Sequence, residues 1–269
     1  MNAAAQMNQG TLLLSRSDIE NWMDMPAVVD AVETAFTSYA RDRAEMPAKT
    51  YIDVPGIDGD FRAMPAYLET DDWRAAGMKW VNVHPNNPTQ SGLPTVMAVV
   101  ILADPDTGVP IAIMDGTALT QYRTGAAAGV ATDYLAVEDA TSLGIIGAGV
   151  QAYAQLDAIS TVRPIENVVV CDQDDEAAEQ FVEAASNSFS AERGTVSEAA
   201  ASDVLSTITP VADPIVQPDD LGAQTHVNAM GADAPGKQEL DESILQAATV
   251  VVDDTEQATH SGELNVAYA

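Results

Sequence analysis

Apolar and polar positions follow two different rhythms along the 269 residues of this chain. Near the N-terminus, the ranges 17–23 and 26–41 are predicted to be helices, and in the second Val29, Val32 and Phe36 fall on one helical face. Between residues 49 and 114, short β-rich runs alternate with proline, glycine and aspartate, which predicts a mostly antiparallel sheet with helices beside it. The predicted strands of this part are 50–54, 61–66, 78–83, 96–102 and 110–114.

The second half of the chain has a strand–helix–strand rhythm. The Ala-rich range 118–135 is predicted to be a helix that joins two domains. Beyond it, continuous apolar runs alternate with helical stretches, which is typical of a doubly wound parallel sheet. The predicted strands are 143–147, 168–172, 203–207, 226–230 and 250–253, and the predicted helices are 152–161, 175–188, 197–201 and 241–247. The expected fold class is therefore α/β, a doubly wound parallel sheet plus a smaller α+β domain.

A glycine-rich loop opens the second domain. The strand 143–147 runs into Gly147-Ala148-Gly149-Val150-Gln151-Ala152, a G-x-G-x-x-A pattern that a helix follows. The first glycine permits a tight turn, the second lets the backbone approach a pyrophosphate, and the small Ala152 lets helix and strand pack closely. The helix N-terminus offers N–H groups to the phosphates. The pattern predicts a Rossmann-type cofactor site with Gly147, Gly149, Val150, Gln151 and Ala152. The alternative is that the glycines form a tight turn without a ligand.

Asp172 closes the next apolar run, somewhat farther from Gly147 than the usual ~20 residues. A carboxylate at this place accepts hydrogen bonds from the ribose hydroxyls of NAD and repels the 2′-phosphate of NADP. Arginine does not follow Asp172, so NAD is favoured over NADP. In so acidic a chain, Asp172 can also be one surface carboxylate among many.

The chain carries 41 acidic and 11 basic residues, a net charge of −30. Such a field repels phosphate backbones and anionic lipid, which argues against nucleic acid and membranes as partners. The acidic residues are spread along the whole chain, which favours adaptation to high salt over binding of a basic partner. The single cysteine, Cys171, and an N-terminus without signal-peptide features predict a cytoplasmic protein.

Basic residues are rare, and the chain has only three lysines, Lys49, Lys79 and Lys237. Lys79 lies in an apolar β-like run, where burial lowers the pKa of an amine and permits proton exchange near neutrality. The alternative is that the aliphatic part of the Lys79 side chain packs on apolar neighbours while its ammonium group stays in water. Arg62 and Arg123 are candidates to bind a substrate carboxylate through two-pronged hydrogen bonds, or to form surface ion pairs.

Asp233 follows the predicted strand 226–230, at the edge where open α/β sheets bind ligands. A carboxylate there can act as a general base or hold an ammonium group, or simply cap the loop. His84, His226 and His260 lack the spacing of metal ligands, so no metal is predicted.

Seven segments together resemble the ornithine cyclodeaminase/mu-crystallin family, in particular its archaeal alanine dehydrogenase branch. They are 59–67, 77–88, 92–102, 123–128, 147–152, 225–240 and 251–266. The resemblance implies a homodimer whose chains have a dimerisation and substrate domain over 1–125 and an NAD-binding Rossmann domain over 126–269. Family members continue beyond the last segment, so we expect the C-terminal part that returns to the first domain to be missing here.

The resemblance also implies roles for individual residues. Lys79 resembles the family's catalytic lysine and Asp233 its catalytic acid. Lys49 and Arg123 resemble the residues that hold the substrate carboxylate, and Thr124 adjoins the cofactor phosphates. The family's reaction begins with hydride transfer from the amino-acid Cα to the nicotinamide, which leaves an imine. Water then releases ammonia in a dehydrogenase, whereas the side-chain amine closes a ring in a cyclodeaminase.

Arg62 helps to choose between these branches. Ornithine-using members have a glutamate at this position, which pairs with the ammonium group at the end of the ornithine side chain. The alanine dehydrogenase branch has arginine at this position, as this chain does. The expected function is therefore reversible, NAD-dependent oxidative deamination of L-alanine to pyruvate and ammonia. The alternatives are an ornithine cyclodeaminase, a ketimine reductase and a nucleotide-binding protein without catalysis.

Overall fold

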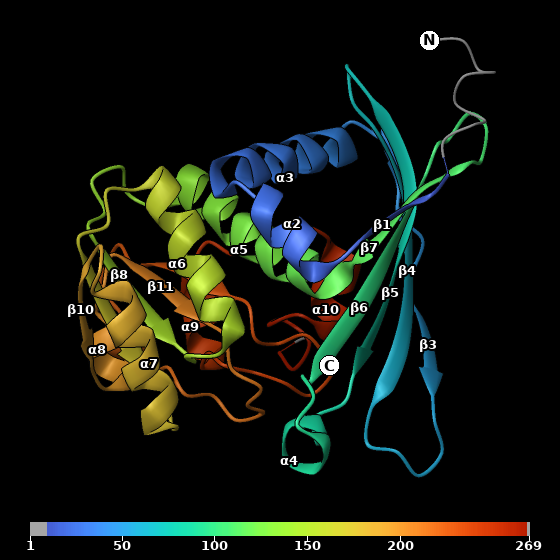
Figure 1. Ribbon diagram of the computed structural model, residues 1–269. Coiled ribbons are helices and arrows are strands. Elements are labelled where there is room, and N and C mark those ends of the chain that lie inside the picture. Colours follow the sequence, from blue (N-terminus) through green and yellow to red (C-terminus); the bar gives the residue numbers. More distant parts are fainter. Residues whose placement is uncertain (1–9, 268–269) are drawn as a thin grey trace. The chain divides into compact units, whose positions relative to one another are not determined.

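The computed structural model describes residues 10–267, and the chain divides at Arg123 and Thr124 into two units. Within the described residues, the first unit carries a sheet in the order β1-β7-β6-β5-β4-β2, and β3 pairs with β4 (Figure 1). All neighbours are antiparallel except β1 and β7. The strands are β1 (Leu12–Leu14), β2 (Ala44–Glu45), β3 (Thr50–Asp53), β4 (Asp60–Glu69), β5 (Arg74–Val83), β6 (Val96–Ala103) and β7 (Pro110–Asp115). The helices are α2 (Arg16–Trp22), α3 (Met25–Ala40), α4 (Asn87–Ser91) and the first part of α5 (Gly116–Leu135).

The two faces of this sheet differ, as side-chain alternation along a strand requires. Ala98 and Ala112 are buried on one face, with 9% and 3% of their surface exposed. On the other face, Val99 and Ile113 are 42% and 37% exposed. The sheet therefore packs one face against its own unit and leaves an apolar face uncovered.

The second unit contains a fully parallel sheet in the order β10-β9-β8-β11-β12. In sequence order this is 3-2-1-4-5, so the chain reverses its direction of winding between β8 and β11. The strands are β8 (Ser142–Ile146), β9 (Asn167–Cys171), β10 (Ser190–Arg193), β11 (Val204–Thr207) and β12 (His226–Ala229). The helices are α6 (Val150–Val162), α7 (Asp175–Ala185), α8 (Val196–Ala200), η1 (Pro218–Asp220), α9 (Glu242–Ala247) and α10 (Thr255–Ser261).

Two apolar clusters lie on opposite faces of the parallel sheet. Leu143 and Ile145 of β8 pack with α6 and α7, where Phe181 is fully buried. The next residue of the strand, Ile146, packs in the other cluster with Ala199 of α8. Helices thus cover both faces, and the predicted α/β class with a Rossmann-type doubly wound sheet is confirmed.

The predicted strand 250–253 is wrong. Val250 and Val251 are 43% and 59% exposed, and the run lies outside every strand pair within residues 10–267. Valine favours a strand only where a neighbouring strand offers hydrogen bonds and packing. Conversely, the pattern does not predict β10, a polar run that forms because the edge of β9 pairs with it. Among residues 10–267, every helix is either too short or too polar to span a lipid bilayer.

Candidate functional site

The glycine loop lies between β8 and α6, at the carboxyl edge of the parallel sheet and beside the point where the winding reverses. Gly147 has φ of 105°, a conformation that favours glycine, and a Cβ there would lie 2.7 Å from the carbonyl oxygen of Ile208. Its N–H donates to the carbonyl of Cys171 at 2.8 Å. The fold itself therefore requires glycine at position 147.

At position 149, by contrast, the fold itself does not require a glycine. Gly149 is the N-cap of α6 with φ of −70°, which any residue adopts. Apart from Gly149 itself and its two chain neighbours, no described residue has an atom within 4 Å of a Cβ built there. The space before the helix N-terminus is thus open to a group that approaches the backbone closely. Thr124 Oγ1 and Gln151 Oε1 are buried without a hydrogen-bond partner among the described residues. An open cradle and two unsatisfied polar atoms fit a polar ligand such as a dinucleotide.

The other predicted cofactor residues surround this loop. Val150 is 63% exposed at the start of α6, and Ala152 is fully buried beneath it. Asp172 follows β9, where its Oδ2 accepts the N–H of Ala148 at 2.6 Å and its Oδ1 accepts the N–H of Asp174 at 2.8 Å. The Asp172 carboxylate thus holds the glycine loop through Ala148, and each of its oxygens can still accept a further hydrogen bond.

Asp233 lies in the loop after β12, whose carboxyl end belongs to the same edge of the sheet. Its N–H donates to the carbonyl of Gly231 at 2.9 Å, and its half-exposed carboxylate pairs with Lys237 Nζ at 2.5 Å. The structure thus places the predicted catalytic acid beside one of the chain's three lysines.

Sequence reasoning missed Glu239, the fully buried residue that holds this edge together. Its carboxylate accepts hydrogen bonds from Thr207, Thr209 and Gly231, the residues at and beyond the ends of β11 and β12. Glu239 falls inside the segment 225–240 that carries the family resemblance. A glutamate among 41 acidic residues, however, gives no local signal of burial.

In the first unit, Lys79 is the centre of a cluster of basic side chains. It projects from β5 opposite Met64 of β4. Burial lowers the pKa of Lys79, and the charges of Arg123, Lys49 and Arg62 lower it further, to about 7. The structure therefore brings the four predicted residues of this unit within electrostatic reach of one another. An amine that loses its proton near neutrality, among three cations, is suited to bind an anion and exchange a proton.

Arg62 is less available to bind a substrate carboxylate than the sequence suggests. Its Nε and Nη2 donate to the two carboxylate oxygens of Asp60 at 2.7 and 2.9 Å, and its guanidinium lies 5.4 Å from the ring centroid of Tyr51. Asp60 and Arg62 are two residues apart on one strand, so their side chains share a face. A substrate carboxylate would have to meet another edge of this guanidinium. Of the three cations that lower the pKa of Lys79, Arg62 has the smallest effect.

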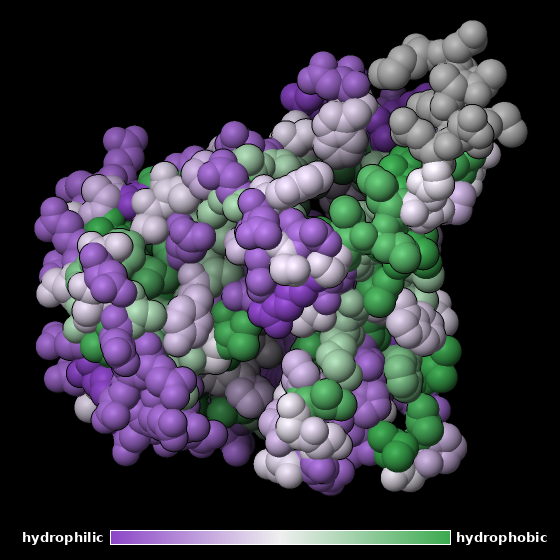
Figure 2. Space-filling model, in the orientation of Figure 1, coloured by the Kyte–Doolittle hydropathy of each residue, from purple (hydrophilic) through white to green (hydrophobic). Residues whose placement is uncertain are grey.

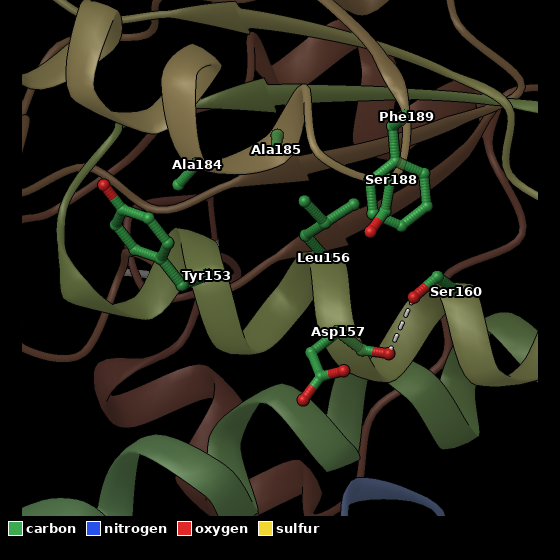
Figure 3. A pocket seen from close by; sticks show the side chains of 8 residues that line it. All are labelled: Tyr153, Leu156, Asp157, Ser160, Ala184, Ala185, Ser188 and Phe189. Atoms are coloured by element: carbon green, nitrogen blue, oxygen red, sulfur yellow. Dashed lines mark hydrogen bonds between the residues drawn. The ribbon is translucent and has the colours of Figure 1, made fainter.

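A separate hollow of about 230 Å³ opens between α6 and α7 (Figure 3). Leu156 and Phe189 line it with Asp157 and Ser160, whose hydroxyl donates to the Asp157 carbonyl at 2.9 Å. Helix sides form this hollow, whereas ligands of such sheets bind at strand ends. None of its lining residues is a predicted site residue, so we do not assign the candidate site to it.

The strand order, the glycine loop beside the reversal of winding and the open helix N-terminus define a protein with a Rossmann-type nucleotide-binding unit. The chain belongs to the ornithine cyclodeaminase/mu-crystallin family, whose sequence model matches residues 9–269.

Three relatives illustrate this membership. The alanine dehydrogenase of Archaeoglobus fulgidus is 48% identical over 258 residues, which are 96% of this chain and 78% of the relative. An archaeal alanine dehydrogenase, solved as a dimer with bound NAD, has a TM-score of 0.90 at 48% identity, over 96% of this chain and 78% of that one. The Δ1-pyrroline-2-carboxylate reductase of Thermococcus litoralis, solved with NADH and L-proline, has a TM-score of 0.90 at 40% identity, over 95% of this chain and 80% of that one.

Proposed function

We propose that this protein is an NAD-dependent alanine dehydrogenase, which converts L-alanine reversibly to pyruvate and ammonia. The observation that carries the proposal is the 48% identity to the alanine dehydrogenase of Archaeoglobus fulgidus over 96% of the chain. The first unit supports it with a cationic cluster suited to a small carboxylate, and the second with an open glycine loop.

Residues of each unit have a proposed role in the reaction. In the first unit, Lys49 and Arg123 hold the substrate carboxylate, and Arg62 adds the positive charge that disfavours a substrate with a distal ammonium group. Lys79, with a pKa of about 7, takes or gives a proton at the substrate nitrogen or at the attacking water. Asp233 of the second unit is the second proton-transfer group.

The second unit provides the proposed cofactor site. The pyrophosphate binds at the N-terminus of α6, in the loop formed by Gly147, Gly149, Val150, Gln151 and Ala152, and Thr124 adjoins it. Within this loop the buried Ala152 lets the helix pack closely on the strand. Asp172 accepts the ribose hydroxyls and disfavours the extra phosphate of NADP. NAD, when bound, supplies the hydride acceptor for the substrate Cα.

The direct test is a panel of L-alanine, L-ornithine and other amino acids with NAD and with NADP in molar salt, followed by the absorbance of the reduced cofactor. We expect pyruvate from L-alanine with NAD. Proline from L-ornithine without pyruvate from L-alanine would assign the chain to the cyclodeaminases instead. Binding of NAD without turnover of any amino or imino acid would indicate a non-catalytic nucleotide-binding protein.

A second candidate is a ketimine reductase, because the Thermococcus litoralis reductase is 40% identical with a TM-score of 0.90. The same hydride step would then run in reverse, from the reduced cofactor to the imine carbon of a cyclic substrate. Rates with Δ1-pyrroline-2-carboxylate and NADH, compared with those for pyruvate, ammonia and NADH, separate the two functions. A preference for the cyclic imine would replace alanine dehydrogenase as the assignment.

We also infer a homodimer that forms through the uncovered apolar face of the first sheet. Leu13 and Ile113 are direct neighbours on this face and are 76% and 37% exposed, and Val99 lies on it too. Figure 2 shows hydrophobic residues gathered over β1 and β7, and a relative of 48% identity was solved as a dimer. In sedimentation velocity, Ile113→Lys is expected to yield monomers, whereas Val251→Lys on the second unit leaves the dimer intact. A monomeric wild type would contradict this inference.

The net charge of −30 supports a further proposal, that the protein works at high salt, and the single cysteine supports a cytoplasmic location. Carboxylates spread over the surface repel one another at low ionic strength, and dissolved salt screens that repulsion.

A further inference from the structure

Glu239 makes an unusual set of contacts for a buried carboxylate. Its side chain is fully buried. In the sequence, Glu239 comes directly after the loop that carries Asp233. Oε1 accepts the N–H and the hydroxyl of Thr209 at 2.6 and 2.7 Å. Oε2 accepts the hydroxyl of Thr207 and the N–H of Gly231, each at 2.8 Å. Burial raises the pKa of Glu239, and these four hydrogen bonds oppose that rise.

These contacts join three segments at the carboxyl edge of the parallel sheet. Thr207 ends β11, Thr209 lies two residues beyond it, and Gly231 follows β12. Ile208, between the two threonines, donates its N–H to the carbonyl of Ile146 at 2.8 Å and presents its own carbonyl to Gly147. The carboxylate therefore braces the stretch of chain against which the glycine loop turns.

The Asp233 loop is attached to the same point. Asp233 donates its N–H to the carbonyl of Gly231, whose own N–H donates to Glu239. A Cβ at Gly231 would lie 2.6 Å from the Glu239 carboxyl carbon, so only glycine permits this approach. A displacement of Glu239 is thus transmitted to the glycine loop through Ile208 and to Asp233 through Gly231.

A second buried glutamate, Glu263, supports the backbone of the first. Its Oε1 accepts the N–H of Glu239 at 2.9 Å and that of Leu240 at 2.6 Å. Its Oε2 is buried without a hydrogen-bond partner among the described residues. Asn265 continues this support, because its Oδ1 accepts the N–H of Gly236 and its Nδ2 donates to the carbonyl of Lys237, both at 2.8 Å.

We propose that Glu239 is a positioning residue, which holds the glycine loop and the Asp233 loop in the one geometry that the proposed dehydrogenase uses. It acts through Thr209 and Gly231 and does not itself touch substrate or cofactor. The inference deepens the proposed function, on which it rests for the roles of the two loops.

The two glutamates provide a matched pair of amide substitutions. Each oxygen of Glu239 faces one main-chain N–H, which can only donate, so in Glu239→Gln the new NH2 group must face a donor in either orientation. In Glu263→Gln the amide oxygen can take the place of Oε1 and accept both N–H groups. Its NH2 then takes the place of Oε2, which has no partner to lose.

The test compares the wild type, Glu239→Gln and Glu263→Gln as full chains in the same salt. We expect amide hydrogen exchange in peptides that cover 144–151 and 228–236 to become at least about tenfold faster in Glu239→Gln, and the Kd for NAD to rise by a similar factor. Glu263→Gln is expected to stay within about twofold of the wild type in both measurements. A folded Glu239→Gln with wild-type exchange in both peptides and an unchanged Kd would overturn the proposal.

Two further measurements complete the design. If Glu239→Gln does not fold, Thr209→Ala removes one of the four hydrogen bonds, and faster exchange in the same two peptides is expected; unchanged exchange there would refute the role of Glu239. Exchange is measured without NAD or substrate, so it tests the positioning role independently. A wild type that fails to oxidise L-alanine would refute the proposed function alone.

Discussion

Lys79 illustrates how its surroundings change the chemistry of a single side chain. Its ordinary pKa is 10.5, and burial together with Arg123, Lys49 and Arg62 lowers this pKa to about 7. Between about pH 7 and 10.5 the unfolded chain binds a proton at this amine that the folded protein has released. The unfolded state therefore binds more protons, and this residue's contribution to stability becomes more favourable as the pH rises through that window.

This shift can be measured directly, because a chain with three lysines gives few lysine side-chain signals in NMR. In protein labelled with 13C-lysine, we expect the Lys79 signal, assigned by its loss in Lys79→Arg, to titrate near pH 7. Arg123→Gln removes the largest of the three charge effects and is expected to raise the midpoint, whereas Arg43→Gln, at a surface ion pair with Asp71, leaves it unchanged. A wild-type midpoint near 10.5 would contradict the burial of this amine.

Some residues of the candidate site can be predicted from sequence, and others cannot. Lysine is so rare in this chain that Lys79 stands out, and the spacing of Gly147 and Gly149 indicates the loop directly. Glu239 cannot be distinguished from the other acidic residues, because its role depends on donors from three segments that only folding brings together. The pairing of Arg62 with Asp60 is local, yet whether they form an ion pair depends on which face of the strand is buried.

At the scale of elements, the two loop glycines predict different consequences of the same substitution. Gly147→Ala places a Cβ 2.7 Å from the Ile208 carbonyl oxygen on a backbone with positive φ, so it is expected to destabilise the unliganded protein by about 1–3 kcal/mol. Gly149→Ala meets open space with φ of −70° and is expected to leave that stability unchanged. If the loop holds a pyrophosphate, the same Cβ intrudes on the ligand and the Kd for NAD rises.

Thermal unfolding without cofactor and NAD titration of both variants check these expectations. A Gly149→Ala protein that folds normally and binds NAD as the wild type does would remove the loop from the cofactor site. Equal thermal stability of Gly147→Ala and the wild type would instead contradict the packing of Ile208 against the turn.

The C-terminus of α5 depends on a side chain from beyond α6. Arg163 is 7% exposed and donates to the carbonyls of Asp133, Ala136 and Val137 at 2.6, 3.1 and 3.0 Å. These groups lie where a helix leaves its last carbonyls without intrahelical partners. Arg163→Ala is expected to lower the free energy of unfolding by about 3 kcal/mol in urea titrations, since it leaves buried acceptors unpaired.

Arg193→Ala is the control for this prediction. Arg193 pairs with Asp175 and Glu179 on the surface, where ion pairs contribute little, and its loss is expected to change stability by less than about 1 kcal/mol. Similar losses in the two variants would mean that the capping contacts of Arg163 do not stabilise α5.

The elements were predictable where local pattern determines them. The helix expected over 26–41 is Met25–Ala40, and the strands before and after α6 lie within a residue of their expected ends. The failures at 250–253 and at β10 have one physical cause. A strand requires a partner, and the availability of a sheet edge is set by residues far away in the sequence.

At the scale of the whole molecule, charge is the dominant feature. With 41 acidic and 11 basic residues, most carboxylates have no cation to neutralise them. Hydrophilic residues cover much of the second unit in the view of Figure 2. At about 0.1 M salt the screening length is roughly 10 Å, so neighbouring carboxylates repel one another across the surface, whereas at about 1 M it falls to roughly 3 Å. Repulsion of this kind opposes the compact state more than the expanded one.

The free energy of unfolding is therefore expected to increase steeply with KCl between about 0.1 and 2 M, as urea titrations at each salt concentration would measure. A variant with fewer exposed carboxylates separates charge screening from the general effect of salt on apolar burial. The substitutions Asp72→Asn, Glu138→Gln, Asp139→Asn and Glu183→Gln remove four charges from exposed positions. Because less repulsion remains to be screened, this variant is expected to be more stable than the wild type at low salt and to gain less from added KCl. Parallel salt dependence in the two proteins would show that the stabilisation does not come from screening, and the high net charge would then need another explanation.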